Sequence, residues 1–110
     1  MKSRYLCGLT ALIVCTLLLN GCGTTAPSTA PPVTAAFVRA GIPQGADAPT
    51  LATGRSLFLS RCIQCHALPE VSRFNSRRLT AIVAKMSGRA NMNAEQQEAL
   101  LKYLLTVRSL

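Results

Sequence analysis

The chain has 110 residues, with 12 Lys and Arg against 4 Asp and Glu, which gives a formal net charge of +8 at neutral pH. This length allows one compact domain and excludes two. The chain also holds 5 cysteines, 3 methionines and 1 histidine, so the side chains that could bind a metal are few.

The first segment has the composition of a secretory signal. Two basic residues within Met-Lys-Ser-Arg precede an almost unbroken apolar run from Tyr5 to Leu19, and the small-residue stretch Asn20-Gly21-Cys22-Gly23 follows. About 15 apolar residues fall short of the roughly 20 that a helix needs to cross a bilayer core, which disfavours a retained transmembrane helix. The sequence therefore predicts a signal peptide over residues 1–21 and an exported protein.

The end of this signal resembles the lipobox of bacterial lipoproteins in Leu19-Asn20-Gly21-Cys22. The resemblance implies that the Cys22 thiol is acylated and that Cys22 becomes the first residue of the mature protein. Cys15 is the poorer candidate, because Val14 before it is bulky where the signal peptidase requires a small residue. The resemblance implies a periplasmic protein anchored by its lipid, with Gly23 favouring the outer membrane over the cytoplasmic membrane.

The charge that remains after residue 21 is strongly positive. From Cys22 onward, ten Lys and Arg stand against four acidic residues, a net charge of +6. Such a surplus raises the rate of encounter with acidic partners and attracts anionic lipid. Nucleic acid is not an expected partner, because the chain is exported and its basic residues are scattered and not grouped with aromatic side chains.

Residues 22–49 are rich in Ala, Pro, Thr and Gly and contain few large apolar side chains. Such a segment cannot bury enough surface to fold alone. We predict a lipid-anchored flexible linker over residues 22–49, with a root-mean-square reach of roughly 30 Å. Docking of residues 37–42 on the domain is the alternative.

Residues 50–110 form the predicted folded domain. A domain of roughly 60 residues is marginally stable with a core of side chains alone, so another group is expected to help fill its centre. No segment alternates like a strand, and apolar residues recur at helical spacing. We therefore predict an all-α domain of about three helices.

The first two helices are predicted from caps and apolar spacing. The first covers residues 54–62 with Thr53 as its N-cap. The second runs from Arg77 to Ser87 and ends at Gly88. Its apolar residues, three and four positions apart on one face, are Leu79, Ile82, Val83 and Met86.

The third helix is predicted to begin after Asn93. Asn93 is a good N-cap, and Gln96 follows three residues later in the manner of a capping box. The apolar residues of this segment are Leu100, Leu101, Tyr103, Leu104 and Val107.

The strongest motif is Cys62-Ile63-Gln64-Cys65-His66, a CxxCH at the end of the first predicted helix. Thiols at positions i and i+3 face the same way and can each add to a vinyl group of one haem, while the adjacent histidine ligates the iron. A redox dithiol would need a βαβ context, and a zinc site would need a second ligand pair. The motif predicts one covalently attached haem c, bound by Cys62 and Cys65, with His66 on the iron.

With this motif, the chain resembles the monohaem class I cytochrome c family from Thr53 to Val107. Gly54-x-x-x-Phe58 resembles the pattern in which a glycine of the first helix lets the last helix cross closely, and Leu100-x-x-Tyr103 resembles the matching face of the last helix. The resemblance implies a small cytochrome c fold in which these two pairs pack together.

The resemblance also implies a methionine as the second axial ligand. His66 is the only histidine, so a second histidine from this chain cannot serve. Met86 is the first choice, because it lies seven residues before the Asn93 cap, a spacing like that of short bacterial cytochromes. Met92 is the alternative, although it abuts the cap, and a gap-filling core methionine is the remaining interpretation of either residue.

Ligation by histidine and methionine leaves the iron no open position, so the resemblance implies one-electron transfer and no enzymatic activity. Acidic redox proteins are the expected partners. One alternative is a five-coordinate haem enzyme or a gas or redox sensor, which the apolar side chains expected near the distal side disfavour. Another is a haem subunit of a larger oxidoreductase complex. The basic residues expected around the haem edge are Arg61, Arg73, Arg77, Arg78, Lys85 and Arg89.

Overall fold

The computed structural model describes residues 29–65 and 67–110, and these residues form helices and no strand. The α-helices are α2 (Ala35–Gly41), α3 (Ala48–Ser60), α4 (Ser76–Arg89) and α5 (Ala94–Arg108), and the short 3-10 turns are η1 (Ile42–Gln44), η2 (Cys62–Gln64) and η3 (Val71–Arg73). The all-α prediction is confirmed for this part of the chain, with one helix more than expected. None of the described helices is long and apolar enough to cross a membrane. The predicted signal and Cys22 lie outside the described residues.

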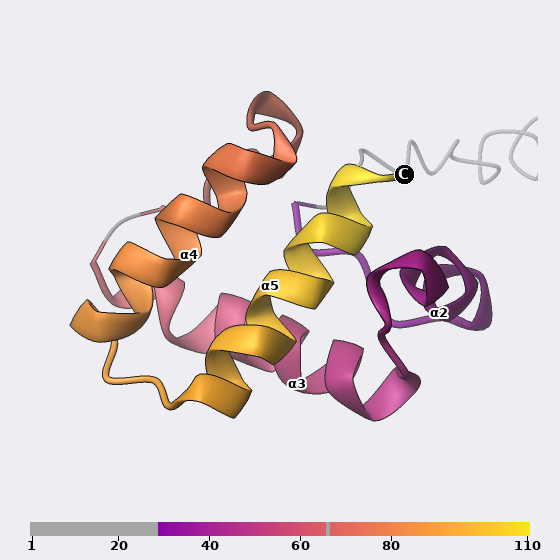
Figure 1. The fold of residues 1–110 in the computed structure, drawn as a ribbon, viewed down its shortest axis with the longest axis horizontal. Coiled ribbons are helices and arrows are strands. Elements are labelled where there is room, and N and C mark those ends of the chain that lie inside the picture. The colour runs from indigo at the N-terminus through magenta and orange to yellow at the C-terminus, as the bar shows by residue number, and fades with distance from the viewer. Residues whose placement is uncertain (1–28, 66) are drawn as a thin grey trace, which may run out of the picture.

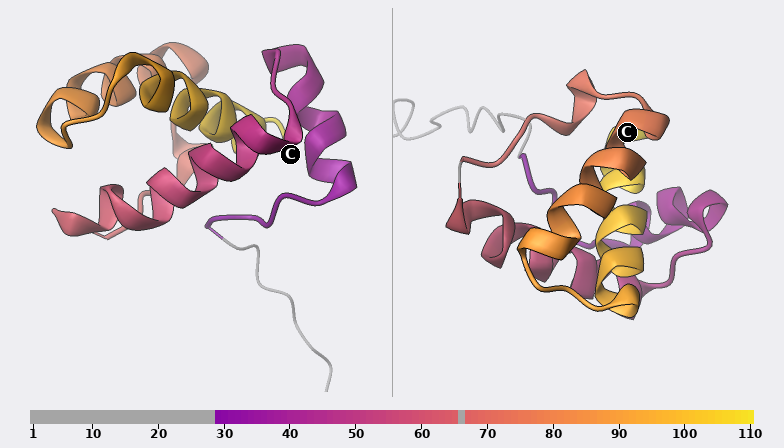
Figure 2. Two further views of the ribbon diagram at one scale, coloured as in Figure 1. Left: turned by 90° about the horizontal axis from the view of Figure 1, so that it is seen from below. Right: turned by 60° about the vertical axis from the view of Figure 1, so that its left-hand side comes forward.

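Helix α5 is the centre of the fold (Figure 1), because α2, α3 and α4 all pack against it. Helices α3 and α4 share at most a marginal contact with each other. Figure 2 (left) shows that α3 diverges from α4 and α5, so that the C-terminal ends of α3 and α4 lie at the same end of the molecule but apart. The core therefore forms along α5 and does not extend between the ends of α3 and α4.

The crossing of α3 and α5 depends on Gly54. A Cβ at this position would lie 2.6 Å from the Cβ of Tyr103 and closer still to the carbonyl oxygen of Ala99. Phe58, one turn further along α3, is fully buried, with its ring centroid 6.1 Å from that of Tyr103. The predicted approach of Gly54 and Phe58 to Tyr103 is confirmed, and the sequence reasoning missed Ala99, whose backbone makes the closest approach to Gly54.

Helix α3 begins six residues earlier than predicted. Its N-cap is Asp47 and not Thr53, and the Asp47 carboxylate accepts a 2.9 Å hydrogen bond from the backbone N–H of Thr50. This bond also holds the pKa of the Asp47 carboxyl below its ordinary value. Pro49 does not break the helix, because the first turn needs no hydrogen bond from that residue.

The end of α4 and the start of α5 are each set by residues close to them in the sequence. Gly88 lies inside α4 and does not end it, contrary to the prediction. The helix ends instead where Asn91 takes a left-handed conformation, with φ of 51°. The capping box at the start of α5 is confirmed: Asn93 Oδ1 accepts from the N–H of Gln96 at 2.8 Å, and Gln96 Oε1 accepts from the N–H of Asn93 at 3.0 Å.

Part of the predicted linker packs against the helices. Phe37 of α2 is 3% exposed, and its ring centroid lies 5.4 Å from that of Tyr103. Ala30 is also buried, whereas Ile42 is 65% exposed. The packed part of the chain therefore starts near Ala30, well before residue 50. The docking alternative is thus confirmed for Phe37 and wrong for Ile42. Composition alone could not decide between linker and docking, because the apolar surface that receives Phe37 comes from α5.

Tyr103 gives this packing a dependence on pH. Burial raises the pKa of its hydroxyl to about 12, against an opposing effect of the Arg55 guanidinium. Because the unfolded chain loses this proton near pH 10, the stability that the neutral phenol contributes is present below pH 10 and lost as the pH rises through 12.

We expect Tyr103→Phe to be less stable than the wild type at pH 8 by about 1 kcal/mol, because a hydrogen bond of the hydroxyl to a backbone carbonyl is lost. The difference should shrink between pH 10 and 12, where only the wild type has this phenol to deprotonate. Urea unfolding of both proteins at pH 8, 10 and 11.5 measures it. A difference that stays constant or grows over this range would contradict the buried neutral phenol.

Candidate cofactor site

The two cysteines of the CxxCH motif follow α3 directly. Cys62 begins η2, is half-buried and packs against the core, whereas Cys65 is exposed. Both are free thiols. Burial raises the pKa of the Cys62 thiol, which disfavours the thiolate that a redox dithiol or a zinc site uses. The described residues also contain no group of three or more His, Cys, Asp or Glu side chains that could hold a metal ion.

His66 lies outside the described residues, but the chain is fixed on both sides of it. Cys62 packs against the core four residues before it, and Leu68 does so two residues after it. Val71 in η3 is 3% exposed. The short segment that contains the predicted axial histidine is therefore attached to the core at each end.

Helix α4 carries two apolar surfaces. Leu79 and Val83 are 2% exposed and belong to the core. Ile82 and Met86 are half-buried and do not belong to the core, although the sequence placed all four on one face. Because helix neighbours lie three and four positions apart, Ile82 and Met86 form a second ridge beside the core face.

The two candidate methionines differ in what surrounds them. Met86 lies in the last turn of α4, with its side chain outside the core cluster. Met92 follows the left-handed Asn91, packs against the core and donates its backbone N–H to the Ser87 carbonyl at 3.0 Å. The side chain of Met86 is thus free of the core, whereas that of Met92 is already used in packing.

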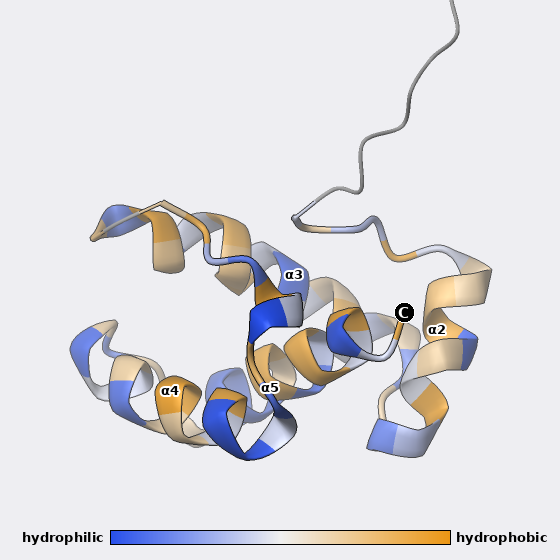
Figure 3. Ribbon diagram, turned by 90° about the horizontal axis from the view of Figure 1, so that it is seen from above, coloured by the Kyte–Doolittle hydropathy of each residue, from blue (hydrophilic) through white to orange (hydrophobic). Residues whose placement is uncertain are grey.

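The CxxC pair and Met86 come to the same end of the molecule from different helices. The pair follows the C-terminal end of α3, and Met86 lies near the C-terminal end of α4. Figure 3 shows apolar residues on both of these helix ends. The structure therefore brings the cysteines and both candidate methionines to one end of the molecule, the cysteines after α3 and the methionines from the end of α4 and the loop that follows it.

The positive charge is concentrated on α4. This helix has four basic residues and no acidic one, and all four are exposed: Arg77, Arg78, Lys85 and Arg89. Two of the four acidic residues are paired elsewhere, Glu70 with Arg73 at 2.6 Å and Glu98 with Lys102 at 2.7 Å. Successive residues of an α-helix are turned by about 100°, which places Arg78, Lys85 and Arg89 beside the ridge of Ile82 and Met86.

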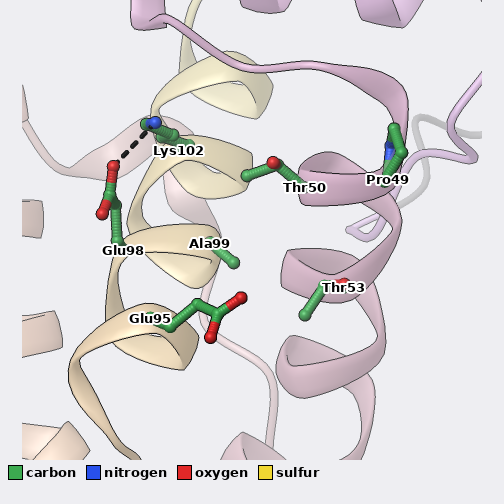
Figure 4. A pocket seen from close by; sticks show the side chains of 7 residues that line it. All are labelled: Pro49, Thr50, Thr53, Glu95, Glu98, Ala99 and Lys102. Carbon is green, nitrogen blue, oxygen red and sulfur yellow. Dashed lines mark ion pairs between the residues drawn. The ribbon is translucent and has the colours of Figure 1, made fainter.

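A hollow between the N-terminal halves of α3 and α5 is shown in Figure 4. Its lining includes the carboxylates of Glu95 and Glu98 and the hydroxyl groups of Thr50 and Thr53. The hydrogen bond from Lys102 lowers the pKa of the Glu98 carboxyl, so this wall of the hollow is charged. A polar hollow at the far end of α3 from Cys62 does not suit an apolar cofactor.

The fold and the site define a small all-helical domain with two free thiols in a CxxCH motif at the end of one helix. No family model matches the chain, and no curated protein and no solved structure matches it significantly.

Proposed function

We propose that this protein is a membrane-tethered monohaem c-type cytochrome that transfers single electrons. The observation that carries the proposal is the position of Cys62 and Cys65 directly after α3, at the end of the molecule where α4 presents Ile82 and Met86 outside the core. One haem bound there would give these side chains the apolar contact that the polypeptide does not supply.

The apolar side chains near Cys62 and Cys65 suit the binding of a haem. Ile63 between the two cysteines is 53% exposed, and Ile82 and Met86 are half-buried, so three apolar side chains at this end remain partly open to water. Covering apolar surface stabilises a protein by about 25 cal/mol per Å². The near absence of contact between α3 and α4 is also consistent with a third body packed between them.

Each residue has a definite role in this proposal. Cys62 and Cys65 would hold the haem through thioether bonds, and His66 and Met86 would be the ligands of its iron. When bound, the haem supplies a one-electron redox couple.

The cations of α4 support acidic proteins as redox partners. Arg78, Lys85 and Arg89 are exposed beside the ridge, and no acidic residue on α4 offsets them. Charge of this kind steers the encounter and speeds association more than it tightens the complex. The resulting complexes would be brief, as repeated electron transfer requires.

We expect Met86→Ala to lose the near-infrared band that marks a sulfur ligand on ferric haem iron, because Met86 alone has its side chain free of the core. Met92→Ala is the matched control and should keep the band while losing about 1–2 kcal/mol of stability, because its half-buried side chain packs against the core. Optical spectra of the oxidised proteins, expressed with a haem-attachment system, measure both effects.

Three other results would change the assignment. Loss of the band with Met92→Ala alone would make Met92 the ligand. A wild type with high-spin iron that binds added small ligands would favour the five-coordinate enzyme or sensor. Copurification in a stable stoichiometric complex would favour a haem subunit of a larger oxidoreductase.

A further inference from the structure

The backbone of residues 30 and 31, where the packed part of the chain begins, accepts hydrogen bonds from side chains of α3 and α5 that are distant in the sequence. The carbonyl oxygen of Pro31 accepts from the Tyr103 hydroxyl at 2.9 Å and from Arg55 Nε at 3.1 Å. Arg55 Nε also lies 3.4 Å from the carbonyl oxygen of Ala30. We call this arrangement of Ala30, Pro31, Arg55 and Tyr103 the clasp.

The residues that follow the clasp stay on the domain as far as the start of α3. Phe37 lies against Tyr103, as described above, and Gly41 lies so near α3 and α5 that a Cβ there would be 2.9 Å from Leu51 Cδ1 and 3.2 Å from Thr106 Oγ1. Ala46 is 8% exposed. The whole stretch from Ala30 to Ala46 is thus held against the helices.

This packing shortens the chain between Cys22 and the domain. Eight residues lead from Cys22 to Ala30, and 25 lead from Cys22 to Asp47. Whatever conformation they adopt, eight residues span at most about 29 Å, whereas 25 could span about 90 Å. The clasp therefore lowers the greatest possible distance between Cys22 and the packed domain about threefold.

We propose that residues 30–46, fastened by the clasp, limit the length of the membrane tether and hold the domain at the lipid surface. The inference rests on the proposed function, in which the lipid on Cys22 anchors a haem domain. A redox partner would then have to present its own redox centre at the membrane surface.

A purely structural role of residues 30–46 is the competing explanation, since a small domain gains stability from any added core. The two explanations differ in what a longer tether does. If the segment serves only the core and another contact holds the domain at the bilayer, such as attraction of its basic residues to anionic lipid, neither opening the clasp nor inserting chain before Ala30 changes the height of the domain. If the clasp sets the tether length, both changes move the domain away from the bilayer.

The test uses four versions of the full-length lipoprotein on supported bilayers of phosphatidylethanolamine and phosphatidylglycerol. They are the wild type, the clasp-opening double variant Phe37→Ala with Arg55→Ala, a Gly-Ser insertion of about 17 residues between Ser28 and Thr29, and the control Ile42→Ala. The control also removes an apolar side chain from this segment, but an exposed one. Neutron reflectometry gives the height of each protein layer without needing a label or a haem.

Trypsin cleavage after Arg39 reports separately whether the clasp is open. Arg39 is exposed but lies within α2, so cleavage requires local unfolding of the docked segment. The double variant should be cut roughly a hundredfold faster than the wild type, because a buried phenylalanine is lost. The insertion variant and Ile42→Ala should be cut at the wild-type rate.

We expect the near edge of the wild-type and Ile42→Ala layers to lie within about 29 Å of the headgroups, because Ala30 belongs to the domain. The layers of the double variant and the insertion variant should lie farther out, because the root-mean-square reach of 25 residues is roughly 1.8 times that of eight. A wild-type near edge beyond about 29 Å would overturn the inference. So would an unchanged height in the double variant with Arg39 cut rapidly, or an unchanged height in the insertion variant.

Failure of the inference and failure of the proposed function give different results. A protein that carries haem but leaves the bilayer on washing lacks the anchor, which removes the inference and keeps the haem site. A protein that stays at the expected height but has no haem spectrum keeps the tether geometry and removes the proposed electron transfer.

Discussion

Replacing Cys62 and Cys65 together with serine will abolish covalent haem attachment. Both thiols lie at the end of α3, and each is needed for one thioether bond in the proposed site. After expression with a haem-attachment system, the double variant should show no haem that survives denaturing electrophoresis. Its thermal midpoint should fall by at least about 10 °C, since about 2 kcal/mol shifts a domain of this size by that much.

Cys22→Ser is the matched control for this experiment. It removes another cysteine of the same chain, but one that the proposal assigns to the lipid. It should keep the full haem spectrum and lose membrane association on washing. If the Cys62 and Cys65 double variant kept haem that survives denaturing electrophoresis, or if Cys22→Ser lost it, the cytochrome assignment would fail.

Gly54→Ala will destabilise the domain by about 2 kcal/mol, the net of an overpacking cost at the upper end of its range and the gain of alanine over glycine in a helix. The added methyl would lie 2.6 Å from Tyr103 Cβ and closer to the backbone oxygen of Ala99, and a backbone cannot turn aside as a flexible side chain can. Overpacking of this kind costs about 1–3 kcal/mol and occasionally more. It outweighs the roughly 0.5–1 kcal/mol that alanine gains over glycine inside a helix.

Gly88→Ala provides the control, because the same change is made inside α4 where no atom beyond the neighbouring helix backbone lies within 4 Å of the new Cβ. It should stabilise the protein by about 0.5–1 kcal/mol. Urea unfolding of both variants and the wild type gives the two opposite signs. A Gly54→Ala protein as stable as the wild type would refute the close crossing of α3 and α5.

The helix ends show which local signals can be read from the sequence. The cap of α5 was predicted correctly, because Asn93 and Gln96 satisfy each other within four residues. The start of α3 was placed too late, because Asp47 is followed by Pro49, which reads as linker composition although the first turn of a helix accepts it. The end of α4 was placed too early, because an isolated glycine costs a helix only about 1 kcal/mol and tertiary contact can offset that.

Part of the candidate site could be predicted from the sequence, and part could not. The CxxCH motif is local, so its residues and their spacing were available from the chain alone. The sequence could not separate Ile82 and Met86 from Leu79 and Val83, because all four have helical spacing, and only the position of α5 decides which pair enters the core.

By itself, the sequence determined the helical class, the capping box of Asn93 and Gln96 and the CxxCH motif, because each depends on residues within a few positions. The glycine at the crossing of two helices was implied by the family resemblance. Only the tertiary structure decided that residues 30–46 belong to the domain and that α4 keeps an open apolar ridge. Both depend on surfaces supplied by α3 and α5, such as the Tyr103 ring and hydroxyl that receive Phe37 and Pro31. Contacts between residues more than 60 positions apart leave no periodic signal in the chain, so the fold alone reveals them.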